Sequence, residues 1–125
     1  MKVADSSYLI EGILRDANLL ANETFVSPDL ALYEVIDALW KHETLIKDLK
    51  EPWARISLFS ELVSAETIQL IRPDKKFLER TYSLSRKHRA STYDMVFVAL
   101  ALELGLELKT HDSRQSTIMS KETKT

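Results

Sequence analysis

Cysteine is absent from the sequence, and this absence removes several kinds of chemistry at once. A disulfide framework, a thiolate zinc site and a cysteine nucleophile are all excluded. Histidine is scarce as well, with three residues in a chain of 125. Any metal ion must therefore be held by oxygen or imidazole ligands, and a site built mainly from oxygen favours Mg²⁺ or Mn²⁺ over zinc.

Long apolar runs are also missing. The longest is the eight residues from Met95 to Leu102, far short of the ~20 that cross a bilayer. Asp5 and Glu11 interrupt any signal-peptide hydrophobic region. We therefore expect a cytoplasmic protein that does not associate with membranes. The net charge of −2 argues against strong non-specific nucleic-acid binding, but not against a local basic patch.

Short strand-like segments alternate with helical patterns along the chain. Strands are predicted at residues 2–4, 24–26, 67–71 and 106–110. Helices are predicted with caps at Ser6 or Ser7, at Ser27 with Pro28 in the first helical position, and from Thr92 to Gly105, with two more between residues 53 and 89. This order predicts one α/β domain over residues 1–125, with a doubly wound, mainly parallel sheet and a frayed polar C-terminal end.

Four acids are expected at the carboxyl edge of such a sheet. Parallel α/β sheets bind their ligands at this edge, outside the carboxyl ends of the strands. Asp5 follows the first predicted strand, Asp112 follows the last, Asp94 begins the buried helix and Glu34 lies in the helix after the second strand. Each acid also has a simpler interpretation. Asp94 fits a capping box, Asp5 and Asp112 fit turn positions, and Glu34 could share a solvated face with Asp37.

The simpler interpretations do not explain why four acids should lie close together. Two like charges ~4 Å apart repel by about 4 kcal/mol at an effective dielectric constant of 20, and a cluster contains several such pairs. A cation is therefore expected among them. A divalent ion held by carboxylates can activate water, and a second ion can stabilise the leaving oxygen of a phosphodiester. The pattern thus favours metal-dependent phosphodiester hydrolysis.

Three stretches in order, "VADSSYLIEGIL", "VSPDLALYEVIDALW" and "STYDMVFVALALELGLELKTHDSR", resemble the PIN-domain ribonucleases, and the short chain is similar to VapC-type toxins. The resemblance implies an endoribonuclease with one or two Mg²⁺ or Mn²⁺ ions, an antitoxin partner and a homodimer. The implied metal-binding and catalytic residues are Asp5, Glu34, Asp94 and Asp112, supported by Ser6, Thr110 and Asp37, and the role of Asp37 stays open.

One basic run precedes Asp94. Arg86, Lys87, His88 and Arg89 suit the phosphates of single-stranded RNA, and equally suit the negative end of a helix dipole. Arg114 is a further candidate for phosphate contact. His111 stands where such proteins commonly carry a small or apolar residue, and either contacts phosphate or is a loop residue. Trp53, Ile56, Phe59 and Leu62 mark a helix face that is either core or a surface for a dimer or antitoxin.

Other functions are compatible with parts of the pattern. A housekeeping RNA-processing nuclease and a catalytically silent PIN-like interaction module both share the implied fold. A receiver-type phosphorylation domain would explain Asp5 and Lys109. It needs an acceptor aspartate after a central strand, where only Asp48 is available, and it leaves Glu34 and Asp94 unexplained.

Overall fold

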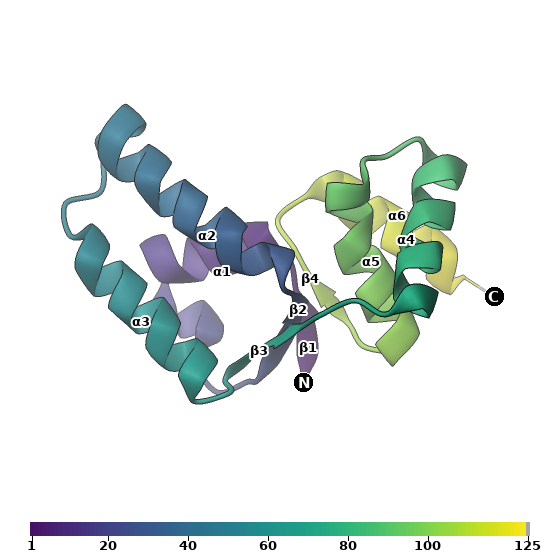
Figure 1. Cartoon of the computed structure of the whole chain (residues 1–125), viewed down its shortest axis with the longest axis horizontal. Helices are drawn as coiled ribbons and strands as arrows, with labels where there is room; N and C mark the ends of the chain where they lie inside the picture. The colour runs from purple at the N-terminus through teal and green to yellow at the C-terminus, as the bar shows by residue number, and fades with distance from the viewer. Residues whose placement is uncertain (125) are drawn as a thin grey trace.

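The computed structural model describes residues 1–124 and has a parallel sheet at its centre (Figure 1). The four strands lie in the order β3-β2-β1-β4, and every pairing is parallel. The strands are β1 (Lys2–Ala4), β2 (Phe25–Pro28), β3 (Ile68–Ile71) and β4 (Leu108–Lys109). The helices are α1 (Ser6–Leu14), η1 (Ala17–Leu20), α2 (Leu30–Lys41), η2 (His42–Ile46), α3 (Pro52–Ser64), α4 (Lys75–His88), α5 (Thr92–Leu104) and α6 (Ser113–Thr123).

Helices cover both faces of the sheet, so the predicted doubly wound α/β fold is confirmed. Helices α1, α2 and α3 lie on one side and α4, α5 and α6 on the other (Figure 1). The strands serve both layers, because successive side chains of a strand point to opposite faces. Ala4 and Phe25 join the core beneath α1 to α3, whereas Val3 and Val26 join the core beneath α4 to α6.

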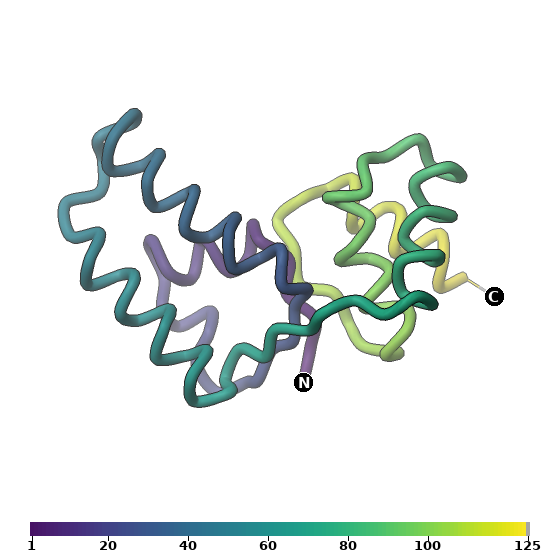
Figure 2. Tube along the Cα trace, viewed as in Figure 1, coloured from purple at the N-terminus to yellow at the C-terminus, as the bar shows by residue number. Residues whose placement is uncertain are grey.

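The order of the chain follows this division. In Figure 2 the purple and blue N-terminal half lies on one side of the sheet, and the green and yellow C-terminal half lies on the other. The chain passes from one side to the other after β3. The two halves therefore meet along the sheet, and a site at its carboxyl edge draws residues from both.

Helix α5 is the buried helix that the apolar run predicts. Its N-cap is Ser91, whose hydroxyl accepts a hydrogen bond from the amide of Asp94 at 3.2 Å. Gly105 ends the helix with φ +64°, a left-handed conformation that glycine adopts at little cost. Phe97 contributes to one core and Val98 to the other. The side chains of α5 thus bind the two layers together, and its first turn is held firmly.

The predicted cap of the second helix is wrong. Ser27 and Pro28 belong to β2, and α2 begins at Leu30. The buried Ser27 hydroxyl donates instead to the carbonyl of Ala4 at 2.7 Å, which ties β2 to β1. Pro28 has no amide hydrogen, and it lies beyond the residues of β2 that pair with β1. The first helix also differs, since its cap is Asp5 and not Ser6 or Ser7.

Sequence reasoning missed a helix in the polar C-terminal segment. Residues Ser113–Thr123 form α6, and Ile118 is buried against the core beneath α4 to α6. Fraying of the last few residues stays a prediction. Ile118 and Gln115 lie three positions apart, so one side of a mostly polar helix faces inward. Thr125 lies outside the described residues. Within residues 1–124, no helix is both long and apolar enough to span a membrane.

Candidate functional site

Asp5 lies at the carboxyl end of β1 and is almost fully buried, with 2% of its surface exposed. Its Oδ1 accepts hydrogen bonds from the Tyr8 amide at 3.0 Å and from the Ser7 hydroxyl at 2.7 Å. Its Oδ2 accepts from the Thr110 hydroxyl at 2.6 Å. Hydrogen bonds to an ionised group are about twice as strong as neutral ones. The orientation of the Asp5 carboxylate is therefore fixed by α1 and by the chain after β4.

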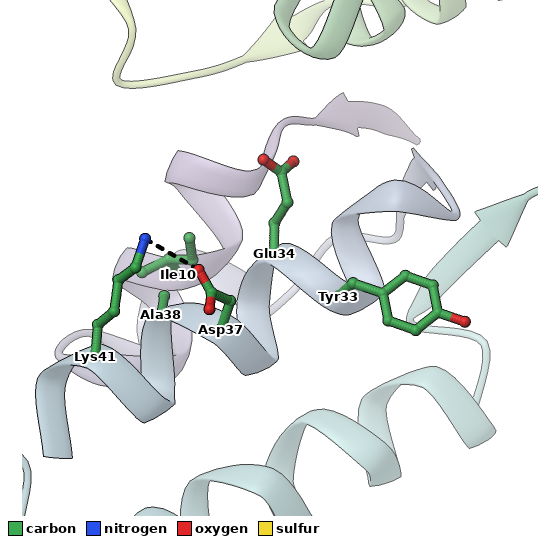
Figure 3. A pocket seen from close by; sticks show the side chains of 6 residues that line it. All are labelled: Ile10, Tyr33, Glu34, Asp37, Ala38 and Lys41. Carbon is green, nitrogen blue, oxygen red and sulfur yellow. Dashed lines mark ion pairs between the residues drawn. The ribbon is translucent and has the colours of Figure 1, made fainter. Parts of the chain in front are cut away.

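Glu34 projects from the second turn of α2 toward the C-terminal half of the chain, whereas Tyr33 points away from it (Figure 3). The Ser6 hydroxyl donates to Glu34 Oε1 at 2.6 Å. Burial raises the pKa of Glu34, the Ser6 hydrogen bond opposes this, and the charges of Asp94 and Asp5 raise the pKa further. Asp94 and Asp5 thus lie close enough to Glu34 for their charges to repel its carboxylate.

Asp94 is half-buried in the first turn of α5, where a negative charge interacts favourably with the helix dipole. Asp37 lies one turn beyond Glu34 on α2 and is exposed. Its carboxylate forms an ion pair with Lys41 at 3.0 Å (Figure 3). Asp37 and Glu34 line the same surface pocket of about 360 Å³, together with Ile10. Asp37 therefore lies beside Glu34, and its charge is partly balanced by Lys41.

Asp112 adjoins this group through Thr110. The Asp112 amide donates to the Thr110 hydroxyl at 2.9 Å, and that hydroxyl in turn donates to Asp5. The Asp112 carboxylate accepts hydrogen bonds from the amides of Arg114 at 2.8 Å and Gln115 at 3.2 Å. Asp112 is therefore the N-cap of α6, as Asp5 is of α1. Both acids make the local backbone contacts that the simpler interpretation expected.

The oxygen atoms of these side chains are suitable ligands for a divalent ion, but their present positions do not form a complete ion site. Carboxylate and hydroxyl oxygens are the ligands that Mg²⁺ and Mn²⁺ prefer. The charges of Asp5 and Asp94 repel that of Glu34, and a cation between them would relieve this repulsion. As the side chains stand, however, no three acidic or histidine residues among residues 1–124 form a group that could hold an ion.

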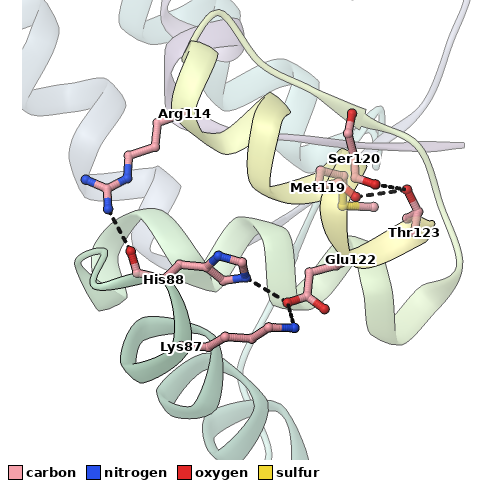
Figure 4. Close-up of polar contacts among 7 residues, drawn as sticks. All are labelled: Lys87, His88, Arg114, Met119, Ser120, Glu122 and Thr123. Atoms are coloured by element: carbon pink, nitrogen blue, oxygen red, sulfur yellow. Dashed lines mark hydrogen bonds and ion pairs between the residues drawn. The ribbon is translucent and has the colours of Figure 1, made fainter. Parts of the chain in front are cut away.

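The basic run has contacts of its own around α6 (Figure 4). Lys87 and His88 both contact Glu122, at 2.9 and 2.7 Å. The Arg114 guanidinium donates to the carbonyls of His88 and Arg89, at 2.8 and 2.9 Å, and so caps the end of α4. Lys87, His88 and Arg114 thus have structural contacts. Arg86 and Arg89 are exposed and form no ion pair with any of residues 1–124.

Sequence reasoning missed the part played by Ser7. Its hydroxyl donates to Asp5 and accepts the amide of His111 at 2.9 Å, so it joins α1 to the loop before α6. A doublet of serines gives no signal that separates a cap from such a bridge. On α3 the apolar residues divide, because Phe59 is 2% exposed and Trp53 is 78% exposed. Ile56 and Leu62 pack partly against the core.

Comparisons with known proteins agree with the observed fold. The family model of the PIN domain matches residues 3–119 of the chain. Ribonuclease VapC3 of Pyrobaculum aerophilum is 32% identical over 84 residues, which make up 67% of this chain and 63% of that protein. The match thus spans less than two thirds of that relative's length.

Proposed function

Because the chain belongs to the PIN domain family, we propose that it is a metal-dependent endoribonuclease that hydrolyses RNA phosphodiester bonds at the carboxyl edge of its sheet. The name of its relative, Ribonuclease VapC3, supports this activity. Membership of this family also favours a nuclease over the receiver-type alternative. A receiver domain assigns no role to Glu34 or Asp94.

The convergence of acids on Glu34 carries the proposal. Its carboxylate is half-buried, hydrogen-bonded to Ser6 and raised in pKa by burial and by the charges of Asp94 and Asp5. Such mutual repulsion lowers the stability of the folded chain unless a ligand offsets it. A divalent cation supplies that offset, and a catalytic role explains why the repulsion persists.

Asp5, Glu34, Asp94 and Asp112 would hold one or two Mg²⁺ or Mn²⁺ ions. When bound, the metal makes water a stronger nucleophile and neutralises charge on the phosphodiester. The protein's own groups supply orientation. Ser6 holds Glu34, and Thr110 holds Asp5 and the amide of Asp112. Asp37 and Lys41 lie beside Glu34 as a neutral pair at the margin of the site.

RNA enters over Arg86 and Arg89, the two exposed arginines of the basic run that have no ion pair within residues 1–124. Phosphate contacts of this kind give affinity that falls as the salt concentration rises. Lys87 and Arg114 add positive charge nearby, although both already have protein contacts. Some residues of the basic run therefore stabilise the end of α4, and others contact the substrate.

The protein acts as the toxin of a toxin–antitoxin pair and forms a homodimer. Support comes from the resemblance to VapC-type toxins and from large apolar side chains at the surface. Tyr33, Trp40 and Trp53 are 71%, 51% and 78% exposed on α2 and α3. Exposed apolar residues that gather on one region of a monomer commonly mark a contact with another protein chain.

Cleavage of a mixed-sequence single-stranded RNA tests the activity. Purified protein with Mg²⁺ or Mn²⁺ should cut the RNA, and EDTA or the Asp94→Asn substitution should stop the cutting. Asp16→Asn is the matched control, because Asp16 is exposed, caps η1 and lies at the opposite end of α1. Cutting that survives both EDTA and Asp94→Asn would refute the proposed activity.

A melting experiment tests the metal site without any RNA. Asp94→Asn should raise the melting temperature in EDTA, because it removes one charge that repels Glu34. It should also abolish the stabilisation by Mn²⁺, which for the wild type is about 2.7 kcal/mol at a hundred times the dissociation constant. A variant that melts lower and keeps the Mn²⁺ effect would contradict the site.

A further inference from the structure

An aromatic pair borders the carboxylates on the side of α1. The rings of Tyr8 and His111 are stacked, with their centroids 5.5 Å apart and their planes 17° from parallel. His111 is exposed, whereas Tyr8 is partly buried beneath it. One face of the imidazole thus rests on protein, and the residue presents much of its remaining surface to solvent.

Tyr8 is a rigid support for this ring. Its hydroxyl donates to the carbonyl of Leu19 at 3.0 Å, and its ring packs against that of Phe25 at 5.6 Å. The amide of Tyr8 also donates to Asp5. Contacts at both ends of the side chain fix the plane of the ring. The orientation of the His111 ring is therefore set by the fold as well as by its own loop.

The backbone of His111 is coupled to the carboxylate site. Its amide donates to the Ser7 hydroxyl at 2.9 Å, and that hydroxyl donates to Asp5 at 2.7 Å. Next in the chain is Asp112, which caps α6. Two hydrogen bonds thus connect the ring-bearing residue to Asp5. The backbone of His111 is thus anchored to the carboxylate site.

The residues that flank Asp112 on either side contact opposite layers. His111 packs on α1, and Arg114 packs on the end of α4. The acids are therefore bordered by an aromatic ring on one side and by cationic side chains on the other. Single-stranded nucleic acid is recognised by this combination of features, in which bases stack on aromatic rings and phosphates contact positive charge.

We propose that His111, supported from behind by Tyr8, is a stacking platform for one nucleobase of the single-stranded RNA substrate. This inference rests on the proposed function for the nature of the ligand. It assigns His111 a positioning role: the stacked base fixes the register of the RNA strand at the acids. The role depends on the flat ring and its exposed face. It does not require the imidazole to carry a charge.

Binding in EDTA tests the platform separately from cleavage. A fluorescein-labelled ten-nucleotide RNA of mixed sequence is titrated with wild type, His111→Ala and His111→Tyr at low salt, and anisotropy is recorded. His111→Ala should weaken binding about five-fold or more, as expected for the loss of one base stack. His111→Tyr should restore binding, because it keeps a flat ring. Tyr82→Ala is the matched control, since Tyr82 is an exposed aromatic residue on α4.

A series of RNAs, each with one abasic position, locates the stacked base. At one position, removal of the base should weaken wild-type binding and should make no difference to His111→Ala. Equal binding by wild type and His111→Ala, or an equal loss with Tyr82→Ala, would overturn the platform. So would the absence of measurable wild-type binding. Failure of the proposed function is distinct, since it appears as missing metal-dependent cleavage while the effects on binding remain.

Discussion

Thr110→Val is the substitution that tests most directly how the site is held together. The Thr110 hydroxyl donates to Asp5 Oδ2 at 2.6 Å and accepts the Asp112 amide at 2.9 Å. Valine has nearly the same shape and volume, so the change removes both hydrogen bonds and creates no cavity. Asp5 is 2% exposed, and water cannot readily replace the lost donor.

The expected cost follows from the charge on Asp5. A hydrogen bond to a charged group contributes about 1.5 to 3 kcal/mol, and leaving a buried acceptor unsatisfied has a cost in the same range. We therefore expect Thr110→Val to lower the free energy of unfolding by about 1.5 to 3 kcal/mol. For a chain of this size the melting temperature should fall by roughly 5 to 15 °C.

Urea unfolding followed by circular dichroism measures this loss. At an m-value of about 1.5 kcal/mol/M, the midpoint should fall by about 1 to 2 M. Thr81→Val is the matched control, because Thr81 is buried and its hydroxyl donates only to the carbonyl of Phe77 in its own helix. Such a bond contributes little. A midpoint for Thr110→Val no lower than that of Thr81→Val would refute the role given to Thr110.

Three further changes probe the charges and the packing. Glu34→Gln should raise the metal-free melting temperature near pH 7, because the pKa of Glu34 is raised in the folded chain. The gain should vanish as the pH falls below about 4.5, where Glu34 is protonated in both the folded and the unfolded chain. A gain that persists in acid would contradict this reasoning. The Glu122 carboxylate has a lowered pKa, chiefly because His88 donates to it, so Glu122→Gln should be less stable than wild type near pH 7. The difference should shrink as the pH falls below the ordinary glutamate pKa of 4.5 and Glu122 takes up a proton in the folded chain. Gly12→Ala would place a methyl group 2.6 Å from Leu20 Cγ, and an overpacking cost of about 1 to 3 kcal/mol should outweigh the gain in helix propensity of about 1 kcal/mol; calorimetry showing a higher melting temperature would count against that packing.

The fold could be predicted because the signals for it are local. The apolar run of α5, bounded by Ser91 and Gly105, fixed both the type of the element and its ends. The start of α2 could not be read in the same way. Ser27 followed by Pro28 is a good local start for a helix, but in the structure Ser27 pairs with Leu70 and Pro28 with Ile71 of β3, and this pairing keeps them extended. Here pairing between distant strands overrides the local helix preference. Such pairing cannot be read from a single segment of sequence.

The rule for ligand binding in α/β sheets predicted that Asp5, Glu34 and Asp94 lie close together, and in the structure the charges of Asp5 and Asp94 act on Glu34. The metal-binding role of these acids stays a prediction. Their hydrogen bonds could not be predicted from the sequence. The bridge of Ser7 between Asp5 and His111 joins residues 104 positions apart in sequence. Tyr8 and His111, whose rings stack, are similarly far apart in the sequence. Contacts of this kind depend on how α1 and the loop before α6 are placed, and periodicity carries no information about that.

The helices explain how the chain tolerates so much negative charge at one edge. Asp5 and Asp112 each cap a helix N-terminus, and Asp94 lies in the first turn of α5. A carboxylate in such a position is stabilised by free backbone amides and by the helix dipole. Glu34 is different, because it lies in the second turn of α2 and accepts its hydrogen bond from the Ser6 hydroxyl. Burial at that position and the nearby charges of Asp94 and Asp5 raise the pKa of Glu34, so the folded chain gains stability when Glu34 takes up a proton or a cation.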